Sequence, residues 1–140
     1  MWSLQRFEEV GGGNGMAFNI KKIDHVQVAA PKGCEEDARN FYSGILGMKE
    51  LEKPKPLQAR GGAWFEFPGF QLHVGVEEPF EPAKKAHPAF VVEGFDELKA
   101  HLLEKGIAVK DDTSIPGSTR FFVADPFGNR LEFLKQTMSQ

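Results

Sequence analysis

Four residues have side chains whose types and spacing could build a metal site: His25, His73, His87 and Glu132. Similar lengths of chain separate His25 from His73 and His87 from Glu132, so the same spacing occurs twice. Imidazoles together with a carboxylate suit a borderline divalent metal such as zinc, nickel, iron, manganese or cobalt. The sequence therefore predicts one divalent metal ion held by three histidines and one glutamate.

The first half of the chain predicts a strand, a helix and three further strands. Apolar residues repeat at helical spacing between positions 38 and 46, and Gly47 supplies the C-terminal stop. A proline pair at positions 54 and 56 is expected to close the second strand. The strands are predicted over residues 23–30, 48–53, 63–67 and 70–76.

The second half repeats this order. Phe95, Leu98 and Leu102 mark a helix that ends at Gly106, and the segment 125–128 (DPFG) is a strong hairpin turn signal. Strands are predicted over residues 86–92, 107–110, 120–124 and 129–134. Each half therefore reads as βαβββ, and the predicted fold class is α+β with two such modules.

The positions of glycine-rich and proline-rich breaks in the chain predict one domain between short ends. The glycine-rich run at 11–15 predicts that residues 1–19 are a flexible leader. Charges and prolines near position 80 predict a linker. The predicted parts are module one at 20–77, the linker at 78–85, module two at 86–136 and a tail at 137–140.

Strand alternation places the candidate ligands on one side of each sheet. Successive side chains of a strand point to opposite faces, so His25, His73 and Glu132 each lie opposite the large apolar residues of their own strand. Polar residues that share a face with a candidate ligand are Gln27, Gln71 and Arg130. This pattern predicts a sheet with an apolar face under a helix and a polar face that lines a pocket.

Further polar residues are assigned by their position. The residues predicted to bind substrate are Gln27, Gln71, Arg120 and Arg130, and the arginines could meet an anionic group. His101 lies on the second predicted helix, away from the ligand-bearing strands, and is expected to be partly solvated. Cys34 lies near a helix start, but no base can be assigned to it, so a passive role is expected.

Composition excludes several classes of function. The net charge is −3 and the pI is near 5.8, so the chain lacks the excess of positive charge that is typical of nucleic-acid-binding proteins. No apolar run approaches the length of a membrane-spanning helix, and the N-terminus lacks the apolar core of a signal peptide. A single cysteine cannot form an intramolecular disulfide, which fits a reducing compartment. The expected location is therefore the cytoplasm, without a nucleic-acid or membrane partner.

Three segments carry a family resemblance: residues 23–26 (IDHV), 41–48 (FYSGILGM) and 125–133 (DPFGNRLEF). They resemble the vicinal oxygen chelate superfamily, which includes glyoxalase I, extradiol dioxygenases, methylmalonyl-CoA epimerase, fosfomycin-modifying thiol transferases and bleomycin-resistance proteins. The resemblance runs from about residue 21 to 136. It implies two βαβββ modules whose curved mixed sheets surround a shared cavity, where a substrate chelates the metal through two oxygens. The family's metal positions would map to His25, His73, His87 and Glu132.

Departures from the family pattern bear on the choice of reaction. Glyoxalase I-like enzymes commonly have Glu at the position of His73, and the epimerases commonly have Gln. The fosfomycin transferases match His25, His87 and Glu132, but Phe122 stands about where they have a functional Tyr, and their basic C-terminal tail is missing. The second-shell His and Tyr of ring-cleaving iron dioxygenases are not visible. Bleomycin-resistance proteins have the fold without the metal.

The resulting hypothesis is a divalent-metal-dependent enzyme of glyoxalase-like type, a lyase, isomerase or epimerase. His25, His87 and Glu132 would hold the metal, which would polarise two substrate oxygens. The predicted catalytic residues are His73 and Glu132, and His73 would complete the metal shell or accept a substrate proton. One alternative is a small-molecule binding or resistance protein that is metal-free or metal-assisted. Another is an Fe(II) ring-cleaving dioxygenase. One module makes only half of a closed cup, so the two modules could close on each other within one chain or pair with those of a second chain. A homodimer with its active sites at or beside the subunit contact is expected.

Overall fold

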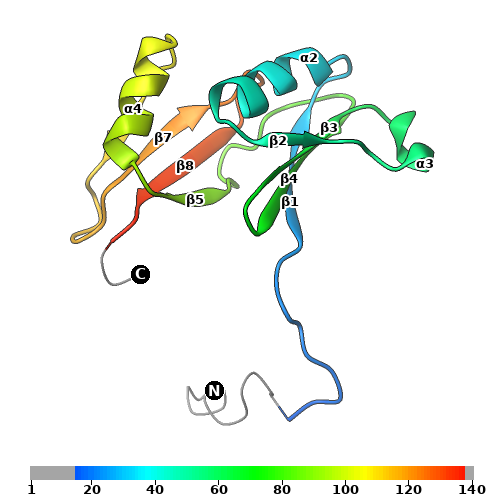
Figure 1. Ribbon diagram of the computed structural model, residues 1–140, viewed down its shortest axis with the longest axis horizontal. Helices are drawn as coiled ribbons and strands as arrows, with labels where there is room; N and C mark the ends of the chain where they lie inside the picture. The colour runs from blue at the N-terminus through cyan, green and yellow to red at the C-terminus, as the bar shows by residue number, and fades with distance from the viewer. Residues whose placement is uncertain (1–14, 138–140) are drawn as a thin grey trace.

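The computed structural model describes residues 15–137. Its fold consists of two four-stranded mixed sheets, each with helices along one side (Figure 1). The first sheet has the order β1-β4-β3-β2, and the second has the order β5-β8-β7-β6. The outer strands β1 and β5 are parallel to β4 and β8, and all other pairs are antiparallel. The strands are β1 (His25–Ala30), β2 (Lys49–Leu51), β3 (Ala63–Phe67), β4 (Phe70–Val76), β5 (Ala89–Val92), β6 (Lys110–Asp112), β7 (Arg120–Ala124) and β8 (Arg130–Lys135). The α+β class and the two βαβββ modules are confirmed.

The helices agree less closely with the prediction. The helix expected over 38–46 begins earlier as α2 (Glu35–Ala38) and continues as the π-helix η1 (Arg39–Ile45). A short helix, α3 (Lys55–Gln58), follows β2, where only a proline-rich break was expected. The helix of module two is α4 (Phe95–Glu104). Among the described residues, no helix is long and apolar enough to span a membrane.

One strand differs in position. The strand expected over 107–110 is instead β6, at Lys110–Asp112, and its sequence is entirely charged. Pairing with β7 explains this placement, because Lys110 lies opposite Phe122 and Asp112 lies opposite Arg120. The Asp112 carboxylate also contacts the Arg120 guanidinium at 3.3 Å. Tertiary pairing therefore overrides the local pattern in this strand.

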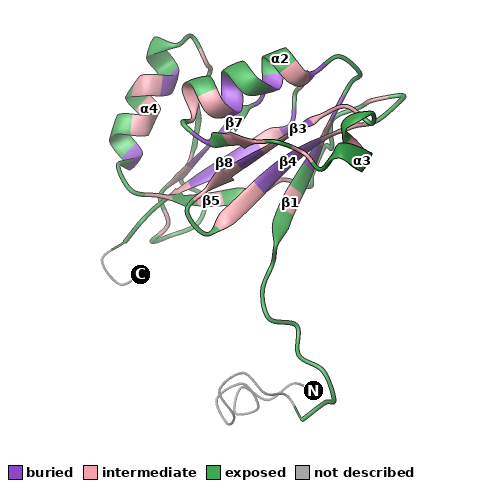
Figure 2. Cartoon of the chain, turned by 45° about the vertical axis from the view of Figure 1, so that its right-hand side comes forward, coloured by how far each residue is buried: buried purple, intermediate pink, exposed green. Residues whose placement is uncertain are grey.

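Each sheet buries one face under its helix, as Figure 2 shows by the purple residues. In module one, Phe65 and Leu72 are fully buried beneath Phe41 and Tyr42. The corresponding residues of module two are Phe121, Leu131 and Phe133, beneath Phe95 and Leu102. Alternation along the strands then leaves His73 and Glu132 on the opposite face of each sheet. We call these the open faces, because the longer helices of residues 15–137 lie on the other side of each sheet in Figures 1 and 2, and only the short α3 lies at one end of the first open face.

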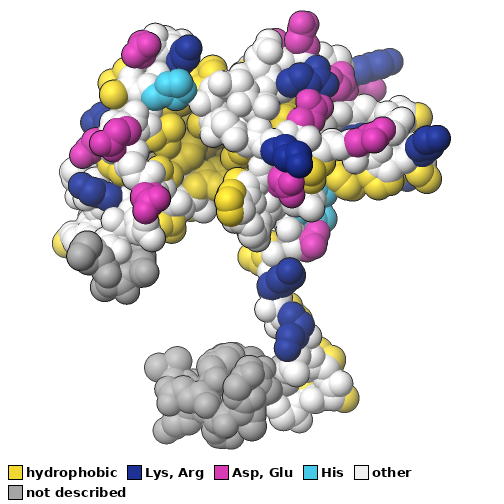
Figure 3. Space-filling view, in the orientation of Figure 1, with side chains coloured by type: hydrophobic (Ala, Val, Ile, Leu, Met, Phe, Trp, Pro, Cys, Tyr) yellow, Lys and Arg dark blue, Asp and Glu magenta, His cyan; other side chains and the backbone are white. Residues whose placement is uncertain are grey.

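The two modules join through a few specific contacts. The Tyr42 hydroxyl donates to Asp125 Oδ2 at 2.7 Å, and Asn129 Nδ2 donates to the carbonyl of Ala29 at 2.7 Å. The rings of Phe67 and Phe90 meet edge to face, with centroids 5.7 Å apart. Apolar side chains line a hollow between the modules, visible in Figure 3. These contacts set how the two open faces lie relative to each other.

The chain before β1 extends away from the sheets (Figure 1). Residues 1–14 of the predicted leader and residues 138–140 of the predicted tail lie outside the described part. From residue 17 to β1 the chain forms no helix or strand. Its large apolar side chains Phe18, Ile20 and Ile23 are 61%, 89% and 66% exposed. These three side chains therefore contribute little to the buried core of the described chain.

Candidate metal centre

His25 and His73 meet on the open face of the first sheet. Gln27 of β1 and Trp64 of β3 flank His73 in the register of the strands. The Trp64 and His73 rings stack with centroids 4.0 Å apart and 5° between planes, and the His25 ring stacks on His73 at 4.0 Å and 16°. Three aromatic rings thus form one continuous stack, which buries His73 to 4% exposure although no helix covers it.

Hydrogen bonds orient these two imidazoles. The Asp24 carboxylate lies 2.9 Å from His25 Nδ1, so Nδ1 carries the proton and Nε2 is left for another partner. His73 Nε2 lies 2.9 Å from Gln71 Oε1. Burial, reinforced by the neighbouring His25, lowers the pKa of His73 to about 4. His73 is therefore a neutral imidazole at pH 7, the form that can bind a metal or accept a proton.

His87 and Glu132 meet on the open face of the second sheet. His87 Nε2 lies 2.8 Å from Glu132 Oε1, and Arg120 Nη1 donates to Glu132 Oε2 at 3.0 Å. His87 Nδ1 donates to the backbone carbonyl of Lys85 at 2.8 Å, which turns Nε2 toward the carboxylate. Burial raises the pKa of Glu132, but the hydrogen bonds from His87 and Arg120 outweigh it and leave that pKa lowered. Glu132 is therefore ionised at neutral pH.

Two arginines and an aromatic ring surround this second pair. The Phe122 ring lies edge-on to His87 at 5.4 Å, and the Arg130 and Arg120 guanidiniums lie 4.5 Å and 5.2 Å from its centre. Arg120 Nε is the one buried side-chain nitrogen or oxygen without a hydrogen-bond partner among residues 15–137. An unpaired buried donor beside Glu132 is suited to an acceptor oxygen of a ligand.

The structure therefore brings the four predicted ligands together in two pairs, His25 with His73 and His87 with Glu132. Within the described chain, no group of three or more His, Cys, Asp or Glu side chains is close enough to hold a metal ion. Each pair is the equivalent of the other in its own module. We call them the first and second half-sites.

The remaining sequence-predicted residues fall into distinct places. Gln71 contacts His73, Arg120 contacts Glu132, and Gln27 projects from β1 near the first half-site. His101 lies on α4, where its Nε2 is 2.9 Å from the carbonyl of Ile45 and away from both half-sites. Cys34 is 2% exposed, and burial, together with the charge of Glu35, raises the pKa of its thiol.

Sequence reasoning missed Trp64, although a signal for it exists. Alternation along residues 63–67 places Trp64 opposite Ala63 and Phe65, and hence on the face of His73. The cations Lys53 and Arg60, which also lie near this face, come from an irregular segment around α3. No periodic signal in the sequence could have placed them.

Comparison with known proteins identifies one family. The model of the Glyoxalase/Bleomycin resistance protein/Dioxygenase superfamily matches residues 22–133. No curated protein matches the chain.

Solved structures extend this likeness. A crystal structure described as a glyoxalase family protein from Bacillus anthracis is 53% identical with a TM-score of 0.83, covering 87% of this chain and 100% of that chain. A glyoxalase family protein from Enterococcus faecalis is 27% identical with a TM-score of 0.64, covering 81% and 97%. A mutant of the fosfomycin resistance protein FosX from Listeria monocytogenes, complexed with Mn(II) and 1S,2S-dihydroxypropylphosphonic acid, has 14% identity and a TM-score of 0.70, covering 86% and 95%. At 14% identity, this last likeness concerns the fold alone.

Proposed function

The chain belongs to the glyoxalase/bleomycin resistance protein/dioxygenase superfamily, and we propose that it is a divalent-metal-dependent enzyme acting on a small molecule that chelates the metal through two oxygens. The reaction type is that of a lyase, isomerase or epimerase. The observation that carries the proposal is the pair of half-sites, each with two metal-binding side chains on an open sheet face.

The donors fit a divalent metal. In His25 and His87, Nδ1 donates to an oxygen acceptor, as metal-binding histidines commonly do with the nitrogen that does not bind the metal. His73 is neutral at pH 7, and Glu132 is ionised. Three imidazoles and a carboxylate favour zinc, nickel, iron, manganese or cobalt over calcium or magnesium.

A complete site requires the two kinds of half-site to meet. Since neither pair has a third ligand beside it in the described chain, the first half-site of one chain would face the second half-site of another. A two-fold dimer makes two such sites, in which His25 and His73 face His87 and Glu132 of the partner subunit. The exposed Phe18, Ile20 and Ile23 of the extended arm support contact with a second chain.

The side chains around the half-sites have separate roles in this proposal. When bound, the metal supplies Lewis-acid stabilisation of negative charge on the substrate oxygens. His73 completes the shell or accepts a proton from the substrate, and Gln71 fixes its orientation. Arg120 keeps Glu132 ionised and offers its unpaired Nε to a substrate oxygen. Trp64 and Phe122 provide apolar walls that exclude water.

Mixing variants tests the shared site. Metal content is measured by mass spectrometry on protein purified without a histidine tag. His25→Ala and Glu132→Ala homodimers should each lose nearly all metal while remaining folded by circular dichroism. After unfolding and refolding together, they should form heterodimers with one intact site each, because both lesions fall in the other site.

A matched pair provides the control. His25→Ala mixed with His73→Ala should restore no metal, since each site of that heterodimer contains one lesion. His101→Ala should keep full metal content, because its imidazole contacts Ile45 and lies outside both half-sites. Full metal content in a protein that stays monomeric at micromolar concentrations would refute the shared site.

A metal-free binding protein is the second candidate. The separation of the two pairs within one chain favours it, because each half-site is then only a polar lining for a bound molecule. Absence of metal from wild-type protein, even after incubation with zinc, nickel, cobalt, manganese and iron(II), would support this candidate and overturn the enzyme.

A further inference from the structure

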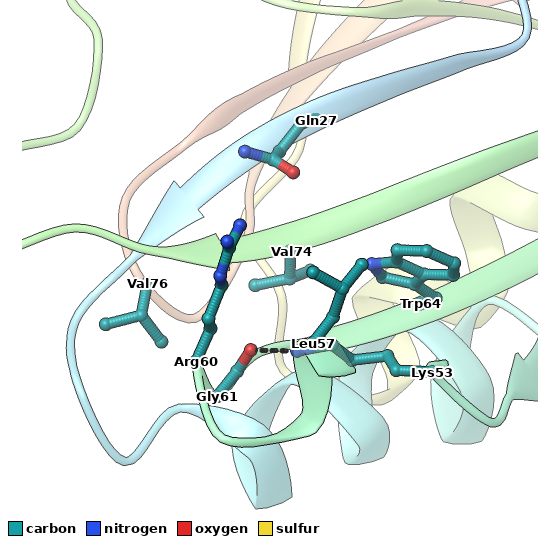
Figure 4. A pocket seen from close by; sticks show the side chains of 9 residues that line it. Gln27, Lys53, Leu57, Arg60, Gly61, Trp64, Val74 and Val76 are labelled. Atoms are coloured by element: carbon teal, nitrogen blue, oxygen red, sulfur yellow. Dashed lines mark hydrogen bonds between the residues drawn. The ribbon is translucent and has the colours of Figure 1, made fainter. Parts of the chain in front are cut away.

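A cavity of about 240 Å³ adjoins the first half-site, at the end of the open face (Figure 4). Strands β1, β3 and β4 form one side of it, and the segment around α3 forms the other. The side chains that matter here are those of Gln27, Lys53, Leu57, Arg60 and Trp64. We call this cavity the α3 pocket.

Glycines shape the pocket. Gly62 has a φ of +88°, and a Cβ there would lie 2.2 Å from the Val74 carbonyl oxygen, so only glycine allows the α3 segment to approach β4 this closely. A Cβ at Gly75 would lie 2.7 Å from Gln27 Nε2 and would push that amide away. The bare backbone at these two positions therefore keeps the pocket narrow at its base and lets Gln27 lie over β4.

The polar lining is cationic. Lys53 and Arg60 both line the pocket, and no lining residue is acidic. Lys53 Nζ donates to the carbonyl of Gly61, which anchors it at the pocket wall (Figure 4). Arg60 extends from the α3 segment toward Gln27 in the same view. Among residues 15–137, no ion pair involves Lys53 or Arg60, although the charge of Lys53 acts on the Glu35 carboxylate and helps to lower its pKa.

Glu35 is an acidic residue beside this region, and its carboxylate is already hydrogen-bonded to the backbone. Glu35 Oε2 accepts the backbone N–H of Gly62 at 2.6 Å. That hydrogen bond is the main reason for the lowered pKa of Glu35. Its carboxylate supports the turn that carries Gly61 and Gly62, and it does not line the pocket. Among the described residues, Arg60 therefore lines the pocket without a carboxylate partner, and Lys53 adds a charge that it shares with Glu35.

The apolar wall connects this pocket to the candidate metal centre. Trp64 lines the pocket and also stacks on His73 at 4.0 Å. Leu57 adds a second apolar surface. One molecule could therefore place an anionic end among the pocket cations, a flat or apolar portion on Trp64, and its reacting oxygens beside His73.

We propose that the α3 pocket binds an oxyanion group of the substrate, a carboxylate or a phosphonate, through Arg60 and Lys53. This inference rests on the proposed function for the position of the reacting end, because it makes His73 the neighbour of that end. Arg60 presents a planar fork of donors that matches an oxyanion, and Lys53 adds a point charge. The substrate class that follows is a small anionic molecule with its two chelating oxygens distant from the anionic end.

Binding to metal-free protein tests the pocket by itself. Trp64 and Trp2 are the two tryptophans of the chain, so a Trp2→Phe background makes Trp64 the sole indole reporter. The full-length protein is treated with a chelator and titrated with phenylphosphonate or benzoate, and with the uncharged analogues benzyl alcohol and benzamide. Phenylphosphonate, benzoate or both should quench Trp64 fluorescence saturably, and the uncharged analogues should bind at least about tenfold more weakly.

Variants assign the effect to the cations. Arg60→Gln should weaken binding of the anionic probe by about tenfold, and Lys53→Gln by a similar factor, as expected for the loss of one charge-assisted hydrogen bond at a partly exposed site. Arg60→Lys should recover part of the loss. Lys55→Gln, at the start of α3 between Lys53 and Arg60 in the sequence but outside the pocket lining, is the matched control and should bind as the parent does.

The outcomes separate this pocket from the proposed enzyme. Equal affinity for charged and uncharged probes, or unchanged affinity in Arg60→Gln, would overturn the pocket even if metal binds fully. Selective probe binding with no metal uptake would uphold the anion pocket while the metal-dependent function falls.

Discussion

Replacing Tyr42 by Phe tests the contact that sets the two modules, and hence the half-sites, relative to each other. The Tyr42 hydroxyl donates to Asp125 Oδ2 at 2.7 Å, and both residues are buried, at 0% and 5% exposure. Burial, and then the neighbouring Asp125 charge, raise the pKa of Tyr42 well above its usual value, so the hydroxyl remains a donor at any working pH. The substitution removes one hydrogen bond between the modules and leaves the ring in place.

The size of the expected loss in the free energy of unfolding follows from the other hydrogen-bond partners of Asp125. Its Oδ1 also accepts the backbone N–H groups of Phe127 and Asn129, each at 2.9 Å, and its Oδ2 accepts Asn129 Nδ2 at 2.9 Å. The carboxylate therefore stays satisfied without Tyr42, and the cost is near the low end for a hydrogen bond to a charged group, about 1.5–2 kcal/mol. For a domain of this size, that corresponds to a drop in Tm of roughly 5–10 °C.

Thermal unfolding followed by circular dichroism measures this loss, with every variant at the same protein concentration because dimerisation would shift Tm. Ser43→Ala is the matched control, since Ser43 follows Tyr42 in η1 and the described structure records no side-chain hydrogen bond for it. The control should stay within about 0.5 kcal/mol of wild type. A Tyr42→Phe Tm within about 1 °C of wild type would show that this hydrogen bond does not stabilise the packing of the modules.

Two further predictions concern groups outside the candidate metal centre. Glu35→Gln should lower stability by about 1 kcal/mol at pH 7, because Glu35 Oε2 accepts the Gly62 N–H and that bond lowers the Glu35 pKa in the folded state. Because the Glu35 pKa is lower in the folded state, its contribution to stability is present above the unfolded pKa, near 4.5, and is lost as pH falls through the folded pKa. Urea unfolding should therefore show that wild type and Glu35→Gln differ less in their free energy of unfolding at pH 3 than at pH 7. An equal difference at both pH values would contradict this. Cys34 should react with a disulfide reagent at pH 8 roughly a hundredfold more slowly in folded protein than in guanidinium, since it is 2% exposed and its thiol pKa is raised by burial. Equal rates would show that the thiol is accessible.

Most of the sheet architecture could be predicted from the sequence because strand alternation and turns are local signals. The hairpin of β3 and β4 is found at the predicted residues 63–67 and 70–76. Helix α3 is not predicted because two nearby prolines usually indicate a break, whereas proline is well tolerated in the first turn of a helix, where Pro56 stands. Strand β6 escaped because Lys110–Asp112 has no apolar alternation and owes its position to pairing with β7.

The candidate site was predictable up to the level of one sheet face. Alternation placed His73 and Glu132 on the faces away from the helices, where the structure has them. Strand pairing within each module brings the candidate ligands together in pairs, but how the two pairs lie relative to each other depends on how the modules pack, and side-chain contacts distant in sequence decide that. The bond between Tyr42 and Asp125 is an example, since no local pattern announces it.

These same contacts explain why the family motifs reveal the fold more readily than the reaction. Tyr42 belongs to the segment FYSGILGM and Asp125 to DPFGNRLEF, so the two motifs meet at the junction of the modules. Asp125 accepts four hydrogen bonds there, and Asn129 reaches from the same turn to the backbone of β1. Of these motif residues, Glu132 belongs to the second half-site and Arg130 lies beside it over the Phe122 ring, whereas His73 and Trp64 lie outside both motifs. The motif residues at the module junction therefore support the packing of the modules, while most side chains of the candidate site lie outside the two motifs.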